Sequence, residues 1–250
     1  MRNIWTIAKR EYKLYFISPI AWVVAFIIFL VLGYFFYSYI LYAANQQLTG
    51  NGSGYVPDMQ SILSPLITIM LFASPAFTMR TLADEQRMGT MEVMLTAPVR
   101  DWELVVGKWL GAFLFYITIL ALTWIYPLVM NQMVKPGIDQ GLLLSQYLGL
   151  FLLFGAFAAI GVMVSSFFSN QIAAFFTTLG VLLILWLLSF PVQASGGVGG
   201  DLLSYLDMQG HLYNTFMQGI VELKDVIYYI SITILALFIG SMSVETRRWR

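Results

Sequence analysis

Residues 142–168 read LLLSQYLGLFLLFGAFAAIGVMVSSFF, a run without one charged side chain. A helix needs about 20 mostly apolar residues to cross the hydrocarbon core of a bilayer, so this stretch is long enough to span a membrane. Five other stretches are apolar over a similar length. The predicted spans are Ile20–Tyr42, Ile62–Met79, Val105–Met130, Leu142–Phe168, Ile172–Phe190 and Val226–Val244. The sequence therefore predicts an all-α integral membrane protein with six transmembrane helices.

The composition supports this fold class. Of the 250 residues, 59% are hydrophobic and 10% are charged, whereas about 25% of the residues in a soluble domain are charged. The chain has no Cys and one His, which excludes disulfides, Cys-bound metals and a multi-His metal site, so we expect no metal on this chain. The 13 basic residues balance the 13 acidic ones, and we expect no nucleic-acid partner.

The basic residues predict the orientation of the chain in the membrane. Eleven of the 13 lie in the N-terminal segment, in or near the loop after the second span, or in the C-terminal tail, and only Lys135 and Lys224 fall on the other side. The positive-inside rule then places both termini and that loop in the cytoplasm, and an even number of spans agrees. Lys108 lies one turn inside the third span, where we expect its ammonium group to reach the interface.

Residues 1–18 are predicted to form an interfacial amphipathic helix that ends before Ser18-Pro19. Apolar residues recur there at helical spacing, with polar residues between them. The apolar stripe is Ile4, Trp5, Ala8, Tyr12, Tyr15 and Phe16, and the other face includes Lys9 and Arg10. We expect Trp5, Lys9, Arg10 and Tyr12 to lie at the membrane surface. The alternative is a basic anchor that only sets the orientation.

Residues 191–225 form the longest outer segment, which is too apolar for a free loop. It is predicted to contain one or two short interfacial helices wedged against the bundle. His211 lies here without partners at ligand spacing, so we expect an ordinary interfacial histidine and not a metal ligand.

The cytoplasmic segment 80–104 begins RTLADEQRMGTMEVMLTAPVRDWE and is rich in charge. Met88, Met91 and Met94 with Leu95 recur within it at spacings of three to four residues. A stripe of Met on a short helix suits docking to another protein, because Met side chains repack adaptably. The periodicity alone leaves open whether this stripe meets a partner or packs on the chain's own bundle.

The chain shows no source of energy of its own. Its only Gly-Lys pair, Gly107-Lys108, precedes Trp109 at the start of a membrane helix and cannot hold phosphates as a P-loop does. No span carries Asp, Glu, His or Arg in its interior, although ion-coupled transporters generally need such groups. No constellation of catalytic residues is recognisable, so we expect that the chain is not an enzyme and that any work it does is driven by a partner.

Three stretches carry a resemblance to a known family, namely Ile7–Trp22, Asp84–Trp109 and His211–Thr233. They resemble permease subunits of ABC transporters of the second exporter class, and within it most closely the short permeases named for gliding motility. The strongest motif is the second. Its matching residues are Glu85, Gly89, Thr90, Glu92, Pro98, Glu103, Gly107 and Lys108.

The resemblance implies a single permease domain over residues 1–250 that pairs with a second permease copy or paralogue and rests on a separate ABC ATPase subunit. ATP and magnesium would bind that ATPase, which leaves no cofactor on this chain. The resemblance makes residues 80–104 the coupling segment. Its ATPase-coupling residues would be Glu85, Met88, Gly89, Thr90, Met91, Glu92, Met94 and Leu95. Gly89 is expected to bend this segment.

The resemblance also implies that the second and fifth spans face the dimer midline, where Ser64, Ser74, Thr177 and Thr178 would line a path or pack helices. The expected location is the inner membrane of a bacterium or archaeon, in contact with lipid, and the expected activity is ATP-driven export. Two other function classes remain open. The first is a membrane scaffold of an envelope machine without its own conduit, and the second is a self-contained secondary transporter.

Overall fold

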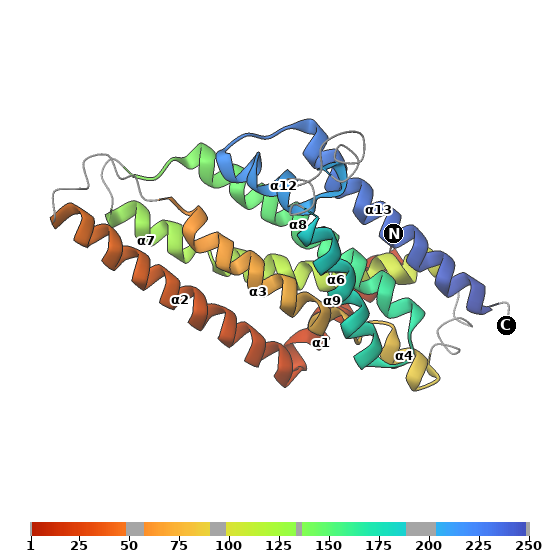
Figure 1. Ribbon diagram of the computed structural model, residues 1–250. Coiled ribbons are helices and arrows are strands. Elements are labelled where there is room, and N and C mark those ends of the chain that lie inside the picture. The colour runs from red at the N-terminus through yellow and green to blue at the C-terminus, as the bar shows by residue number, and fades with distance from the viewer. Residues whose placement is uncertain (1, 49–57, 91–98, 134–136, 189–203, 249–250) are drawn as a thin grey trace.

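The computed structural model describes residues 2–48, 58–90, 99–133, 137–188 and 204–248, and within these ranges the chain is helical and contains no strand (Figure 1). The elements are α1 (Arg2–Ile17), α2 (Pro19–Leu48), α3 (Gln60–Thr78), α4 (Ala83–Arg87), α6 (Asp101–Leu122), α7 (Ile125–Met133), α8 (Gln140–Phe167), α9 (Gln171–Leu187), α12 (Met208–Tyr213), the 3-10 helix η1 (Phe216–Gln218) and α13 (Leu223–Arg248). The predicted all-helical class is confirmed.

Five helical stretches are long and apolar enough to cross a membrane. They are Ala21–Asn45, Gln60–Arg87, Asp101–Met133, Gln140–Phe167 and Leu223–Thr246. The remaining predicted span, Ile172–Phe190, corresponds to α9, which is apolar but has 17 described residues. Residues 189 and 190 lie outside the described part. Five of the predicted spans are therefore found, and a total of six stays a prediction.

The third predicted span is not one continuous helix. The chain leaves α6 after Leu122 and resumes as α7 at Ile125. Pro127 accounts for the break, because a proline ring inside a helix clashes with the carbonyl group four residues earlier, here that of Thr123. The Thr123 hydroxyl donates to the Leu120 carbonyl oxygen at 2.7 Å and lies 3.1 Å from the Tyr147 hydroxyl of α8. The bend is thus held by a polar contact to the neighbouring helix.

The long helix α8 occupies the centre of the bundle and packs against α13, α6, α9 and α3. Its small residues let neighbours approach closely: a Cβ atom on Gly161 would lie within 2.6 Å of Thr78 side-chain atoms of α3, and one on Gly149 would meet Phe216 of η1. Because lipid and side chains are equally apolar, close packing of this kind is the main source of helix association in a bilayer.

Different helices lie at the two ends of the bundle. Figure 1 shows both chain ends and α4 toward one end, while the end of α2 and the start of α3 lie at the other. The connection between α8 and α9 is tight: only residues 168–170 separate the two helices, and the Asn170 side chain caps α9 by accepting from the amide of Ile172 at 2.9 Å. Which end faces the cytoplasm remains a prediction.

The N-terminal helix forms over the predicted residues, but it packs on protein along its length. Helix α1 lies against the first half of α6, with Ala8 and Tyr15 buried. Gly107 and Gly111 of α6 permit this contact, since a Cβ atom on Gly111 would lie 2.5 Å from Glu11 Cβ. Trp5 and Phe16, which the apolar stripe had included, are exposed instead.

The outer segment contains the short helices that the sequence predicted, in α12 and η1. The 3-10 helix η1 is wedged against α8: the Ser145 hydroxyl donates to the Phe216 carbonyl oxygen at 2.9 Å, and the Gln146 amide donates to that of Met217 at 3.2 Å. Helix α12 packs on η1 and α9. Residues 191–203 of the predicted segment lie outside the described part.

Candidate functional site

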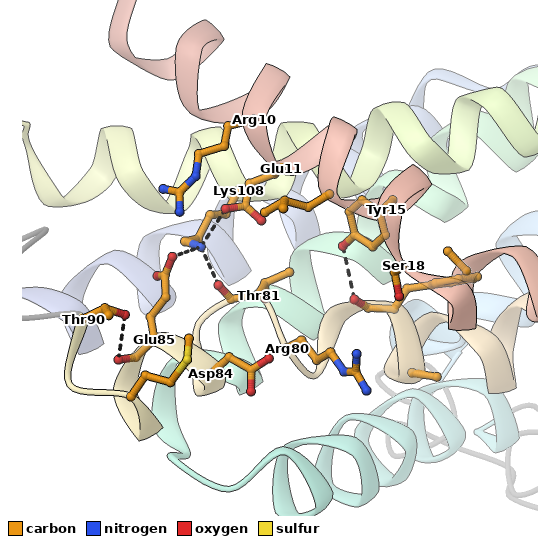
Figure 2. A pocket seen from close by; sticks show the side chains of 15 residues that line it. Arg10, Glu11, Tyr15, Ser18, Arg80, Thr81, Asp84, Glu85, Thr90 and Lys108 are labelled. Atoms are coloured by element: carbon orange, nitrogen blue, oxygen red, sulfur yellow. Dashed lines mark hydrogen bonds and ion pairs between the residues drawn. The ribbon is translucent and has the colours of Figure 1, made fainter.

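A buried lysine joins three segments at the end of the bundle that holds α4. Lys108 is 1% exposed. Its Nζ donates to Glu11 Oε1 of α1 at 3.0 Å, to Glu85 Oε1 of α4 at 2.7 Å and to the Thr81 carbonyl oxygen at 2.5 Å (Figure 2). The expectation that this ammonium group reaches the interface is therefore wrong, because two carboxylates and a carbonyl group satisfy its three N–H bonds inside the protein.

We refer to Lys108, Glu11 and Glu85 as the charge cluster. One ammonium group faces two carboxylates here, and Glu85 Oε2 is buried without a hydrogen-bond partner among the described residues. Transfer of charges out of water is costly unless each is paired and hydrogen-bonded, so removing one partner would be strongly unfavourable. The cluster therefore fixes the relative positions of α1, α4 and the start of α6.

Helix α4 is also fixed to the turn between α8 and α9. Ser165 Oγ accepts from the amides of Leu82 and Ala83 at 3.1 and 3.0 Å, which satisfies two donors at the N-terminal end of α4. Gln86 Nε2 donates to the Ser166 carbonyl oxygen at 2.8 Å. The Gln171 amide of α9 donates to the Asp84 carboxylate. Neither serine is recognisable from the sequence, because a contact to a helix about 80 residues away leaves no local pattern.

The chain turns sharply after α4. Gly89 has a φ of +69°, which L-residues with a side chain seldom adopt, and it provides the bend that the sequence predicted. Thr90 Oγ1 donates to the Glu85 carbonyl oxygen at 3.4 Å. Met88 is 67% exposed just before the bend. The remaining predicted coupling residues, Met91, Glu92, Met94 and Leu95, lie outside the described residues.

Glu85 differs from the other predicted coupling residues in its position. Its side chain points toward Lys108 and is buried, so it does not face a surface on which a partner could dock (Figure 2). On α1, Trp5, Lys9 and Arg10 are exposed, whereas the Tyr12 hydroxyl lies 2.9 Å from Thr118 Oγ1 of α6. Tyr12 therefore contacts the bundle.

Of the four residues predicted to line a path or a dimer interface, two are buried and two reach the surface. Ser74 is buried and accepts from the Tyr116 hydroxyl at 3.0 Å, and Thr178 is buried and donates to the Ala174 carbonyl oxygen at 2.7 Å. Ser64 is half-buried and Thr177 is exposed. In this arrangement only Ser64 and Thr177 are available to a second chain.

A cavity of about 390 Å³ lies beside the charge cluster, between α1, the start of α2, the end of α3 and α4. Its lining combines charged side chains with an apolar wall that includes Leu14 and Phe77. Figure 2 shows Arg10 and Arg80 on opposite walls, Arg10 from α1 and Arg80 from the chain that follows α3.

A second polar cluster lies in the outer segment. His211 Nδ1 is 2.6 Å from Asp225 Oδ1 of α13, and His211 Nε2 is 3.0 Å from the Tyr205 carbonyl oxygen. The imidazole stacks on Tyr228 at a centroid distance of 4.0 Å. The expectation of an ordinary interfacial histidine misses this pairing, which joins residues 14 positions apart in two different helices. Nearby, burial raises the pKa of Asp207, the N-cap residue of α12.

The side chains around α4 connect several helices to one another. Within the described ranges, no three His, Asp or Glu side chains form a group that could hold a metal ion. The charge cluster and the serine and glutamine contacts join α4 to α6, α8 and α9, and through Lys108 to α1.

Comparison with known proteins gives one clear relationship. A search of curated proteins found no match. A family model described as ABC-2 family transporter protein matches residues 5–244, which is nearly the whole chain. Proteins of this family are the membrane-spanning components of ABC transporters and work with an ABC ATPase, so the helices above belong to a multi-pass permease. On this evidence, the chain is a member of the ABC-2 transporter family.

Proposed function

We propose that this chain is the permease subunit of an ATP-driven exporter and that its coupling segment, residues 80–104, receives movement from a separate ATPase subunit that binds ATP and magnesium. In this proposal two permeases form the translocation path. Each has six spans, an N-terminal helix at the inner surface and both termini in the cytoplasm of a bacterium or archaeon. Within the family, the resemblance of Asp84–Trp109 favours a relationship to the gliding-motility-type permeases.

The observation that supports the proposal best is the charge cluster. Lys108 binds α1 through Glu11 and binds the coupling segment through Glu85 and the Thr81 carbonyl oxygen, while its own backbone belongs to α6. A force applied near Gly89 would therefore reach α1 and α6 together with α3. Such a joint is what a rigid-body transition driven from the cytoplasmic side requires.

Two contacts would carry the same movement to the centre of the bundle. Ser165 and Ser166 attach α4 to the end of α8, and Gln171 attaches it to the start of α9. Tilting of α4 would then shift α8 and α9 with it. Because α9 is the predicted fifth span, this route would move the face that exposes Thr177 toward or away from a second permease.

The first experiment is copurification of the tagged chain in detergent with the ATPase that binds it, followed by measurement of ATP hydrolysis with and without the permease. Met88→Asp and the double variant Met91→Asp/Leu95→Asp test docking at the coupling segment. Ile220→Asp is the matched control, since Ile220 is also exposed but follows η1 in the outer segment.

We expect both coupling-segment variants to lose the ATPase while the control retains it. Copurification with envelope proteins and no ATPase would instead favour the scaffold. An ATPase that binds all variants equally would overturn the assignment of residues 80–104. Glu85→Lys is a poor test of docking, because it also breaks the contact with Lys108.

A further inference from the structure

The cavity beside the charge cluster has unpaired positive groups at its rim. Six charged side chains line it: Arg10, Glu11, Arg80, Asp84, Glu85 and Lys108. All three carboxylates already receive a donor, Glu11 and Glu85 from Lys108 and Asp84 from the Gln171 amide.

The two guanidinium groups differ from the carboxylates in this respect. Neither Arg10 nor Arg80 makes a hydrogen bond or ion pair within the described part of the chain, and both are exposed. Figure 2 shows them on opposite walls of the cavity. The free charged donors of the lining are therefore the two guanidinium groups, although the six formal charges cancel and Glu85 Oε2 receives no hydrogen bond. Guanidinium groups bind phosphate particularly well, because their planar fork matches two phosphate oxygens.

Part of the remaining lining is apolar, while Ser18, Thr81 and Thr90 add hydroxyl groups. Leu14 of α1, Ala21 of α2, and Ala76 and Phe77 of α3 form a wall beside the arginines. The volume of about 390 Å³ falls in the range of about 300–1,000 Å³ that small-molecule sites occupy. A ligand that fits both parts must carry a phosphate at one end and hydrocarbon at the other.

The position of the cavity indicates where such a ligand would come from. The elements that line it lie at the end of the bundle that holds α4 (Figure 1), which is the cytoplasmic end if the proposed function is correct. Anionic phospholipids give the cytoplasmic leaflet its negative potential, and basic pockets between membrane helices on that side bind their head groups.

We propose that one anionic phospholipid of the cytoplasmic leaflet binds in this cavity. Its phosphate binds at the arginine side of the lining, and its acyl chains leave along Ala21 and Ala76. This site rests on the topology of the proposed function. The lipid would occupy the space between α1 and α4, and would brace the N-terminal helix against the coupling segment.

The test measures lipid retention by the purified chain without any ATPase, using native mass spectrometry after exchange into phosphatidylglycerol, phosphatidylcholine or inorganic phosphate. Arg10→Gln/Arg80→Gln removes both rim charges. Arg87→Gln is the matched control, since Arg87 is exposed in α4 but does not line the cavity. We expect one tightly held phosphatidylglycerol on the wild type and on Arg87→Gln. The double variant should retain at least about tenfold less of this lipid, because charge-assisted hydrogen bonds to its phosphate are removed.

Equal retention of phosphatidylglycerol by the wild type and the double variant would overturn the proposal. Equal retention of phosphatidylcholine would do so as well, because that lipid has the same phosphate but no net charge. Displacement of phosphatidylglycerol by inorganic phosphate alone would assign the rim to a soluble phosphate compound and exclude the lipid.

A second variant keeps the test valid if the double variant does not elute as a single species. Ala76→Leu narrows the apolar side and leaves the arginines in place, so it should lower phosphatidylglycerol retention, and unchanged retention would refute the site. These results are independent of ATPase copurification, so failure of the lipid site and failure of the proposed function are distinguishable.

Discussion

Replacement of Lys108 by Met tests whether the charge cluster holds the N-terminal helix and the coupling segment together. The substitution preserves the length and apolar stem of the side chain but removes the ammonium group. Glu11 and Glu85, both largely buried, would then face each other without a cation.

The expected loss of stability is large. At an effective dielectric constant of about 20, the gross attractions over the observed 2.7 and 3.0 Å are about 6 and about 5.5 kcal/mol, before any cost of desolvation. Measured effects of removing one partner of a buried ion pair are smaller, about 3–5 kcal/mol, because the two carboxylates partly relax. At about 2–4 °C per kcal/mol for a chain of this size, the unfolding midpoint should fall by about 6–20 °C.

The assay is thermal unfolding of the purified chain in a mild detergent, followed by intrinsic tryptophan fluorescence. Lys224→Met is the matched control. The Lys224 ammonium group is as close to a carboxylate, 2.6 Å from Glu222 Oε2, but the two side chains are 65% and 42% exposed. Water screens this pair, so its loss should leave the midpoint unchanged within error.

The triple variant Lys108→Met/Glu11→Gln/Glu85→Gln separates an uncompensated charge from a general packing defect. Neutral replacement of a whole buried cluster is often tolerated, so the triple variant should recover most of the lost stability. If Lys108→Met unfolds at the wild-type temperature, or if the triple variant is no more stable than the single one, the reasoning about the cluster is wrong.

Three further predictions concern packing and the outer segment. Gly111→Ala should lower the free energy of unfolding by about 1–3 kcal/mol in the same assay, as overpacking does, because the added Cβ atom would meet the backbone of α1. Gly180→Ala is the control: its Cβ atom would meet nothing within 4 Å, so it should not be destabilising. His211→Phe should retain the stacking on Tyr228 but leave the buried carboxylate of Asp225 without its donor, so proteolysis of the outer segment should be faster than in the wild type; equal rates would contradict this. Burial raises the pKa of Asp207 in the folded protein. The contribution of protonated Asp207 to the free energy of unfolding is therefore complete below the unfolded-state pKa and is lost as the pH rises through the folded-state pKa. Thermal midpoints of Asp207→Asn should therefore lack that part of the pH dependence, and identical pH profiles would refute the assignment.

The sequence predicted the features that depend on local pattern. Periodicity identified α1, and Ser18-Pro19 marked its end. The apolar runs identified the five helices that are long and apolar enough to cross a membrane. The break of the third span at Thr123 was also readable in principle, since Pro127 stands four residues later. The apolar run continues through the proline, so the predicted span Val105–Met130 did not include this break.

The features that were missed depend on contacts between distant residues. Lys108 is buried because Glu11, 97 positions earlier, and Glu85, 23 positions earlier, meet it in space. One signal was available, namely Glu11 inside a helix face that is otherwise apolar. Gly107 and Gly111, four residues apart, were a second, since small residues at this spacing mark a close helix contact. Neither signal identifies the partner helix without the fold.

The separation of Glu11 and Lys108 along the chain has a consequence for the order in which the protein is made. The N-terminal helix leaves the ribosome 97 residues before the lysine that holds it in place. At synthesis rates of about 5–20 residues per second, that interval lasts about 5–20 s. Throughout it Glu11 lacks the ammonium group that it contacts in the folded chain. The contact that holds the N-terminal helix to α6 therefore forms only after α6 has been made, although α1 is translated before α6.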